Sequence, residues 1–153
     1  MRSLFDLPAH PFFIHLPLVL VPFNAIAAVA IACRRRWQRR FSVALSIAAF
    51  VAAAGAVMAA RSGEELNEDL SSRIGPLAEE HQALAETAVW LALAYFVATI
   101  GLVLVQRVAA LESNEAIAQG VMMIAVALAI GAAVWMIRAG HEGSRIVWDG
   151  VIS

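Results

Sequence analysis

The sequence predicts an all-α integral membrane protein built as a four-helix bundle. Hydrophobic residues make up 61% of the 153 residues, and the mean hydropathy of +0.77 is well above that of an ordinary soluble domain. In addition, four long stretches contain no Asp, Glu, Lys or Arg. We therefore expect a single transmembrane domain that covers residues 1–153 and contacts the lipid bilayer along most of its length.

Each uncharged stretch has the length of a helix that crosses a membrane. A transmembrane helix needs about 20 apolar residues, and lipid offers the backbone no hydrogen-bond partners outside the helix itself. The stretches also lack the alternating polar face of a barrel strand. The four predicted spans are residues 12–33, 41–60, 87–105 and 116–137.

Arginine predicts the orientation of these spans, because the chain contains no lysine. Basic charge that is concentrated in a short loop keeps that loop on the cytoplasmic side of the membrane. The connection 61–86 and the tail 138–153 carry most of the acidic residues. We therefore expect a multi-pass membrane protein with both termini outside. The loop after the first span contains Arg34, Arg35, Arg36, Arg39 and Arg40.

A short internal repeat suggests that the bundle consists of two similar helical hairpins. Residues 61–65 (RSGEE) end the second span and residues 138–142 (RAGHE) end the fourth, so both read Arg-x-Gly-x-Glu. Two hairpins of the same orientation are related by an axis along the membrane normal, which brings equivalent side chains together. The repeat pairs His10 with His81, His15 with Glu86, and Glu64 with His141.

All four histidines fall at the end of the bundle that is predicted to face outward. Ionisable residues at membrane helices usually face the interior and mark functional sites, and imidazole is a common ligand of zinc, copper and iron. Four-helix bundles also build dinuclear sites from inward-facing Glu and His. The sequence therefore predicts a site for one or two transition-metal ions, with six ligands: His10, His15, Glu64, His81, Glu86 and His141.

Further carboxylates are expected to support these ligands. A histidine that binds a metal usually donates the hydrogen of its other ring nitrogen to an acceptor, which orients the ring. Glu65 and Glu142 lie next to predicted ligands in the sequence. We expect these two glutamates to act as such acceptors.

A b-type heme is an open alternative to a bare metal. Heme ligation by two histidines needs a pair on facing helices with an apolar slot between them. His15 with His81, or His15 with His141, meets the first requirement. The nearby glutamates favour a bare metal, whereas the hydrophobic surroundings of His15 favour heme.

Other classes of function have less support. The sequence has no Gly-rich phosphate loop, nucleophile elbow or HExxH motif, and nothing in it indicates nucleic-acid binding. Whether the protein is an enzyme stays open, as does a homo-oligomer. A third interpretation is a non-catalytic assembly or anchoring subunit, in which case replacing a single histidine would leave both metal content and function unchanged.

Several motifs together resemble a known family. They are HPFFIHLP at residues 10–17, SGEE at 62–65, His81 before the third span, and GHEG at 140–143. This set resembles the bacterial membrane proteins catalogued as domain of unknown function 2231, over nearly the whole chain. The resemblance implies four spans and a respiratory or redox setting with cytochrome c-like partners. The chain departs from the family pattern at Gln82, where a glutamate is common, and at Ser144, where a second glycine is usual.

Overall fold

The computed structural model describes residues 3–4, 7–8, 10–108 and 115–148. Two short strands, β1 (Ser3–Leu4) and β2 (Leu7–Pro8), pair antiparallel ahead of the helices. Helices alone were expected from the sequence, so this small hairpin is an addition to the expected fold. Three helices follow in chain order: α1 (His10–Ala32), α2 (Arg35–Arg107) and α4 (Glu115–Trp148).

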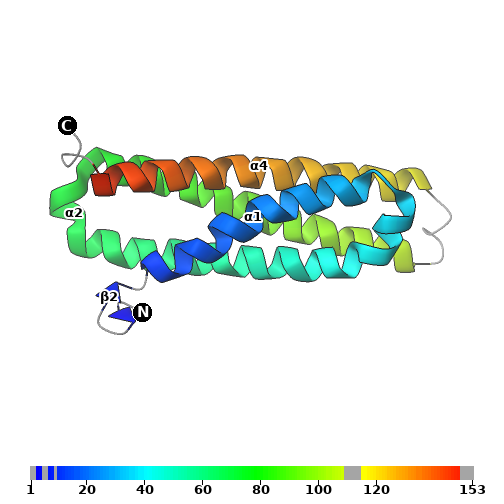
Figure 1. Cartoon of the computed structure of the whole chain (residues 1–153), viewed down its shortest axis with the longest axis horizontal. Coiled ribbons are helices and arrows are strands. Elements are labelled where there is room, and N and C mark those ends of the chain that lie inside the picture. Colours follow the sequence, from blue (N-terminus) through cyan, green and yellow to red (C-terminus); the bar gives the residue numbers. More distant parts are fainter. Residues whose placement is uncertain (1–2, 5–6, 9, 109–114, 149–153) are drawn as a thin grey trace.

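Helix α2 supplies two of the four rods of the bundle. It runs the length of the bundle, turns back at one end and returns beside its own first half (Figure 1). We call Arg35–Glu65 the first arm and Ala78–Arg107 the second arm. The connection 61–86, which was expected to separate two spans, is helical throughout, so the helices extend well beyond the predicted spans.

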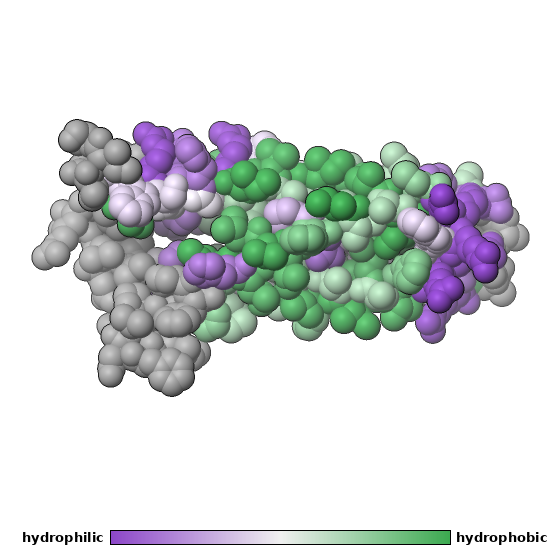
Figure 2. Space-filling model, viewed as in Figure 1, coloured by the Kyte–Doolittle hydropathy of each residue, from purple (hydrophilic) through white to green (hydrophobic). Residues whose placement is uncertain are grey.

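The four rods have the properties of membrane-crossing helices. Within the described residues, Phe13–Ala32 of α1, both arms of α2, and α4 are each long and apolar enough to cross a bilayer. Hydrophobic residues cover the middle of the bundle, and hydrophilic residues gather toward both ends (Figure 2). The predicted fold class, an integral membrane four-helix bundle, is confirmed.

The two ends of the bundle differ in composition. At one end α1 begins, α2 turns back and α4 finishes, and we call it the histidine end because His10, His81 and His141 belong to these segments (Figure 1). At the other end lie the junction between α1 and α2, the last residues of α2 and the start of α4. We call this the arginine end, after the arginines of residues 34–40.

Burial follows the same pattern in both halves of the chain. Residues 80 positions apart occupy equivalent buried places in the first arm and in α4: Ala49 and Ala129, Ala52 and Ala132, Ala53 and Ala133, Ala59 and Ala139. Residues 71 positions apart do so in α1 and the second arm: Val21 and Ala92, Asn24 and Tyr95, Ala28 and Thr99, Ile31 and Leu102. The bundle is therefore two similar hairpins, α1 with the first arm and the second arm with α4.

Small residues let the helices approach one another closely. A Cβ atom added to Gly55 would lie 3.0 Å from Cδ2 of Leu16, and one added to Gly140 would lie 2.9 Å from Cδ1 of Leu18. A side chain at either position would require the leucine to shift, so these glycines let the leucines of α1 pack directly against α2 and α4. Close backbone approach at small residues is a major source of helix association in membranes.

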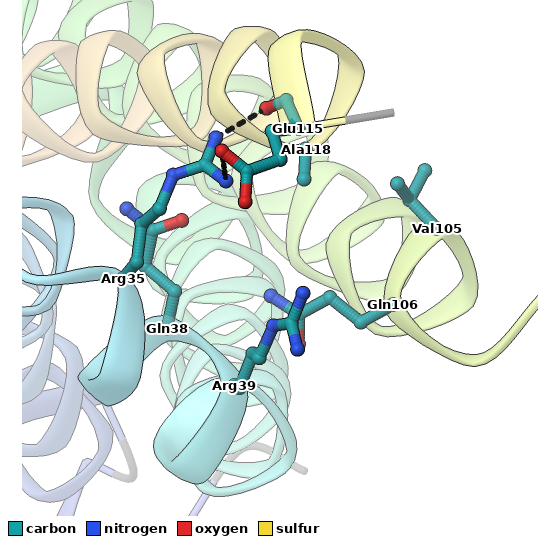
Figure 3. Close-up of a pocket in the computed structure, with 7 residues that line it drawn as sticks. All are labelled: Arg35, Gln38, Arg39, Val105, Gln106, Glu115 and Ala118. Atoms are coloured by element: carbon teal, nitrogen blue, oxygen red, sulfur yellow. Dashed lines mark hydrogen bonds and ion pairs between the residues drawn. The ribbon is translucent and has the colours of Figure 1, made fainter. Parts of the chain in front are cut away.

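Polar contacts join the helices at the arginine end. The amide nitrogen of Gln38, which is buried, donates to the carbonyl oxygen of Ala32 at 3.0 Å and to Oε1 of Gln119 at 3.1 Å. The Arg35 guanidinium donates to the carbonyl oxygen of Glu115 at 2.7 Å and also forms an ion pair with its carboxylate (Figure 3). These contacts connect α1, α2 and α4 around a cavity of about 20 Å³, which has room for about one water molecule.

Candidate functional site

The first predicted ligand, His10, begins α1 and is half-buried against the first arm. Its Nδ1 lies 3.0 Å from the carbonyl oxygen of Ala59 and 3.3 Å from Oγ of Ser62. Because a carbonyl oxygen can only accept, Nδ1 carries the hydrogen and donates it to Ala59. The neutral ring therefore keeps an unprotonated Nε2, the form of imidazole that binds metals.

The surroundings of His10 favour this neutral form. Burial lowers the pKa of the His10 imidazole below its usual value of 6.5; the hydrogen bond to Ala59 opposes this shift, and the charge of a protonated His81 adds to it. A pKa below 6.5 leaves most His10 rings uncharged at neutral pH.

His81 makes the same contact in the other half of the bundle. It lies in the second arm close to the reversal of α2, and its Nδ1 lies 2.9 Å from the carbonyl oxygen of Ala139 in α4. The same argument assigns the hydrogen to Nδ1, so that Nε2 of the neutral ring carries the lone pair. His10 and His81 are thus anchored identically, each to a backbone carbonyl of the neighbouring helix.

The two rings lie close to each other. Their centroids are 6.3 Å apart, and the ring planes are nearly perpendicular, at 82°. Each ring also lies against a glycine: a Cβ added to Gly63 would be 3.0 Å from Cε1 of His10, and one added to Gly143 would be 3.0 Å from Cε1 of His81. Each glycine follows the accepting alanine by four residues, so the two lie on the same face of the helix. The alanine carbonyl accepts the hydrogen bond from the imidazole, and the glycine leaves room for the ring.

This geometry corrects the register of the internal repeat. The motif Arg-x-Gly-x-Glu aligned Gly63 with Gly140, but the contacts of His10 and His81 make Gly63 equivalent to Gly143. The pairing of Glu64 with His141 is therefore wrong, and Ser144 occupies the position equivalent to Glu64. Three residues along a helix correspond to a rotation of about 60° from the starting face. Alignment of the two copies on their exposed motif residues therefore compared different faces of the two helices.

The pairing of His15 with Glu86 fits the 71-residue offset, but both side chains are exposed. The Glu86 carboxylate accepts a hydrogen bond from Nε2 of Gln82 at 3.0 Å. His141 and Glu64 are also exposed, in α4 and in the first arm. The structure thus brings His10 and His81 together and leaves the other four predicted ligands on the surface of the same end.

No larger ligand cluster is present in the described part of the chain. Among those residues, no three His, Cys, Asp or Glu side chains are grouped closely enough to hold a metal ion.

For His10 and His81, the acceptor at Nδ1 is a backbone oxygen and not a carboxylate. Glu142 accepts a hydrogen bond from Nη1 of Arg145 at 2.8 Å, one turn along α4. Glu65 is half-buried in the first arm. The imidazole hydrogens of His10 and His81 go instead to the carbonyls of Ala59 and Ala139.

The role of these two alanines was not predicted from the sequence. Every residue has a backbone carbonyl, so the type of a residue does not reveal that its carbonyl accepts a hydrogen bond from a histidine. The available sequence signal was the spacing Ala-x-x-x-Gly, which occurs at residues 59–63 and again at 139–143. That spacing places the acceptor and the space for the ring on one helical face.

Comparisons with known proteins agree with this architecture. Searches of curated proteins and of solved structures gave no match. A family model described as "Predicted membrane protein (DUF2231)" matches residues 6–153, which include both hairpins and both anchored histidines. With four helices able to cross a bilayer, the chain is a multi-pass membrane protein, and it belongs to the DUF2231 family.

Proposed function

We propose that this protein binds a transition-metal centre at the histidine end of the bundle and acts in redox chemistry or metal handling. One observation carries the proposal: His10 and His81 are both anchored through Nδ1 to a backbone carbonyl and lie with ring centroids 6.3 Å apart. An imidazole that is oriented through one nitrogen offers the other as a fixed ligand.

The separation of the rings supports a shared metal. Two imidazoles bound to one ion through metal–nitrogen bonds of ~2.0–2.1 Å have ring centres about 5–6 Å apart. The observed 6.3 Å is close to this range. Binding of one zinc, copper or iron ion by both rings requires each Nε2 to lie about 2.0–2.1 Å from the ion.

Water or nearby carboxylates would complete the coordination. Glu64 directly follows Gly63, on which the His10 ring lies, and it is the first candidate among the exposed residues. His15, Glu86 and His141 would have to turn inward from the surface to bind the same ion. Glu65 and Glu142, from the same end, would support the site by accepting hydrogen bonds from bound water.

A b-type heme is the second candidate, and the ligand count favours it. Bis-histidine ligation of heme iron takes two axial histidines from the protein, and His10 and His81 form a close pair. The pair would be His10 with His81, in place of the combinations with His15 expected from the sequence.

The proposed setting is the bacterial inner membrane, with the arginine end in the cytoplasm and the histidine end outside. The arginines of residues 34–40 support this orientation through the positive-inside rule. A site at the outer face would be accessible to respiratory partners such as cytochrome c-like proteins.

An optical spectrum of the detergent-purified protein, with and without dithionite, together with elemental analysis of the same sample, tests the proposal. Stoichiometric iron, copper or zinc without a Soret band supports the bare metal. A Soret band that shifts on reduction identifies heme. A sample with neither would contradict the proposal and leave His10 and His81 as contacts that hold helices together.

A further inference from the structure

The arginine end carries a strong excess of positive charge. Its described residues include one carboxylate, Glu115, which is paired with Arg35. Positive charge at a membrane face attracts anionic lipid headgroups. The arginines at this end are Arg34, Arg35, Arg36, Arg39, Arg40 and Arg107.

An open apolar groove lies between the two arms of α2. Its volume is about 290 Å³ and its walls are almost entirely hydrocarbon. Ile47 and Phe50 are more than half exposed along it, and the ring of Phe50 lies 5.4 Å from that of Phe96 between their centroids. The lining residues are Val43, Ser46, Ile47, Phe50, Phe96, Ile100 and Val103.

The helical faces that line the groove continue into arginines. Residues three and four apart share a face of a helix, so Arg40 and Arg39 lie on the face of Val43, one turn closer to the arginine end. Arg107 follows Val103 by four residues in the second arm, so it also lies on the groove face, one turn closer to the arginine end. All three arginines are exposed, and Arg39 extends toward Gln106, the neighbour of Arg107 (Figure 3). Positive charge therefore stands at the mouth of an apolar groove.

We propose that this groove binds an anionic phospholipid, with the phosphate at Arg39, Arg40 and Arg107 and one acyl chain between the arms of α2. Guanidinium groups bind phosphate oxygens through charge-assisted hydrogen bonds. From Arg39 to Phe50 the helix rises about 16 Å, which matches the hydrocarbon thickness of one leaflet, about 15 Å. Headgroup and chain contacts are thus spaced as they are in a lipid molecule.

A second copy of the chain fits this surface less well. A two-fold interface places the same surface of each copy against the other, so the arginines at the mouth of the groove would face their own counterparts. Like charges across an interface are unfavourable. A phospholipid with a negative headgroup instead neutralises them.

Native mass spectrometry of the full-length protein in detergent tests the proposal. The protein is incubated with equal amounts of phosphatidylglycerol and phosphatidylcholine that have identical acyl chains. We expect phosphatidylglycerol to be retained at least fivefold more than phosphatidylcholine. The double variant Arg39→Gln/Arg107→Gln should bring the two lipids close to parity, whereas Arg39→Lys/Arg107→Lys should keep most of the preference because it preserves the charge.

Matched controls separate the groove from general effects. Arg138→Gln removes an exposed arginine at the histidine end and should leave the preference unchanged. Ile47→Trp fills the groove and should lower retention of both lipids by at least threefold, while Ile130→Trp, at an exposed isoleucine of α4 outside the groove, should not. Circular dichroism confirms that each variant is helical.

Three results would overturn the proposal. One is equal retention of the two lipids by the native chain. This result does not depend on the folding of any variant. Another is a phosphatidylglycerol preference that the double glutamine variant keeps in full. The third is a dimer that Ile47→Trp converts to a monomer, which would assign the groove to a second copy of the chain.

Discussion

His10 and His81 are 71 positions apart in the sequence, yet their rings lie 6.3 Å apart and make the same hydrogen bond to equivalent alanines of neighbouring helices. Each ring is held at three places: its own helix, a carbonyl oxygen at 2.9–3.0 Å and a glycine surface. In the proposed function this symmetric pair of imidazoles shares a metal ion, and the predictions at this end test that proposal.

Replacement of either histidine should remove the metal. We expect His10→Ala and His81→Ala each to lower metal content at least tenfold, because one remaining imidazole cannot hold the ion at this end. Elemental analysis of purified protein measures the effect. Glu79→Ala is the matched control, since Glu79 is exposed on the same arm, two residues before His81. Unchanged metal in both histidine variants would exclude the pair as the site.

Substitution of the supporting glycines should disturb the rings without removing a ligand. In Gly63→Ala or Gly143→Ala the new methyl group would lie 3.0 Å from Cε1 of an imidazole that is held by its hydrogen bond to a carbonyl. Overpacking costs about 1–3 kcal/mol, which exceeds the gain of about 0.5–1 kcal/mol from alanine inside a helix. We expect a lower unfolding temperature and reduced metal content in both variants, to a similar extent because the two positions are equivalent.

Gly120→Ala is the control for these two substitutions. A Cβ at Gly120 meets no atom within 4 Å, and alanine is favoured over glycine inside a helix by about 0.5–1 kcal/mol. The unfolding temperature of this variant should stay the same or rise. If Gly63→Ala and Gly143→Ala behaved like Gly120→Ala, the close packing of the rings on α2 and α4 would be refuted.

His10 should become protonated at a lower pH in the folded protein than in the unfolded chain. Burial lowers the pKa of its imidazole below 6.5, the value expected for the unfolded chain. As the pH falls below 6.5 the unfolded state takes up a proton first, so the contribution of His10 to stability, complete above pH 6.5, is lost as the pH falls toward the folded-state pKa. Histidine NMR resonances of the metal-free protein, followed from pH 7.5 to 4.5, measure this pKa; a value at or above 6.5 would contradict the prediction.

The single cysteine offers a direct test of the proposed orientation. Cys33 is exposed at the arginine end, so a membrane-impermeant maleimide should label it from the cytoplasmic side only. In the variant Cys33→Ser with Glu80→Cys, the new thiol lies at the histidine end and should be labelled from outside. Intact spheroplasts and inverted vesicles give the two accessibilities. Labelling of native Cys33 in intact spheroplasts would reverse the orientation.

Much of the fold could be predicted from the sequence because lipid constrains it so strongly. Uncharged stretches such as 12–33 and 116–137 must form helices in order to satisfy their backbone groups. Consecutive spans alternate in direction, which is enough to bring residues as distant as His10 and His81 to one end. The helical connection 61–86 was missed, because its polar composition resembles a loop and its charges give no hydropathy signal.

The gathering of the histidines at one end could be predicted from the sequence, but their arrangement could not. The sequence by itself determined that His10, His15, His81 and His141 share one end of the bundle, since this depends on the order of the spans. The tertiary structure decided that His10 and His81 face each other while His15 and His141 are exposed. The physical reason is rotation about the helix axis. The contacts of the two imidazoles at Ala59, Gly63, Ala139 and Gly143 show which face of each helix turns inward. A difference of three residues in the alignment of α4 would turn that face by about 60°.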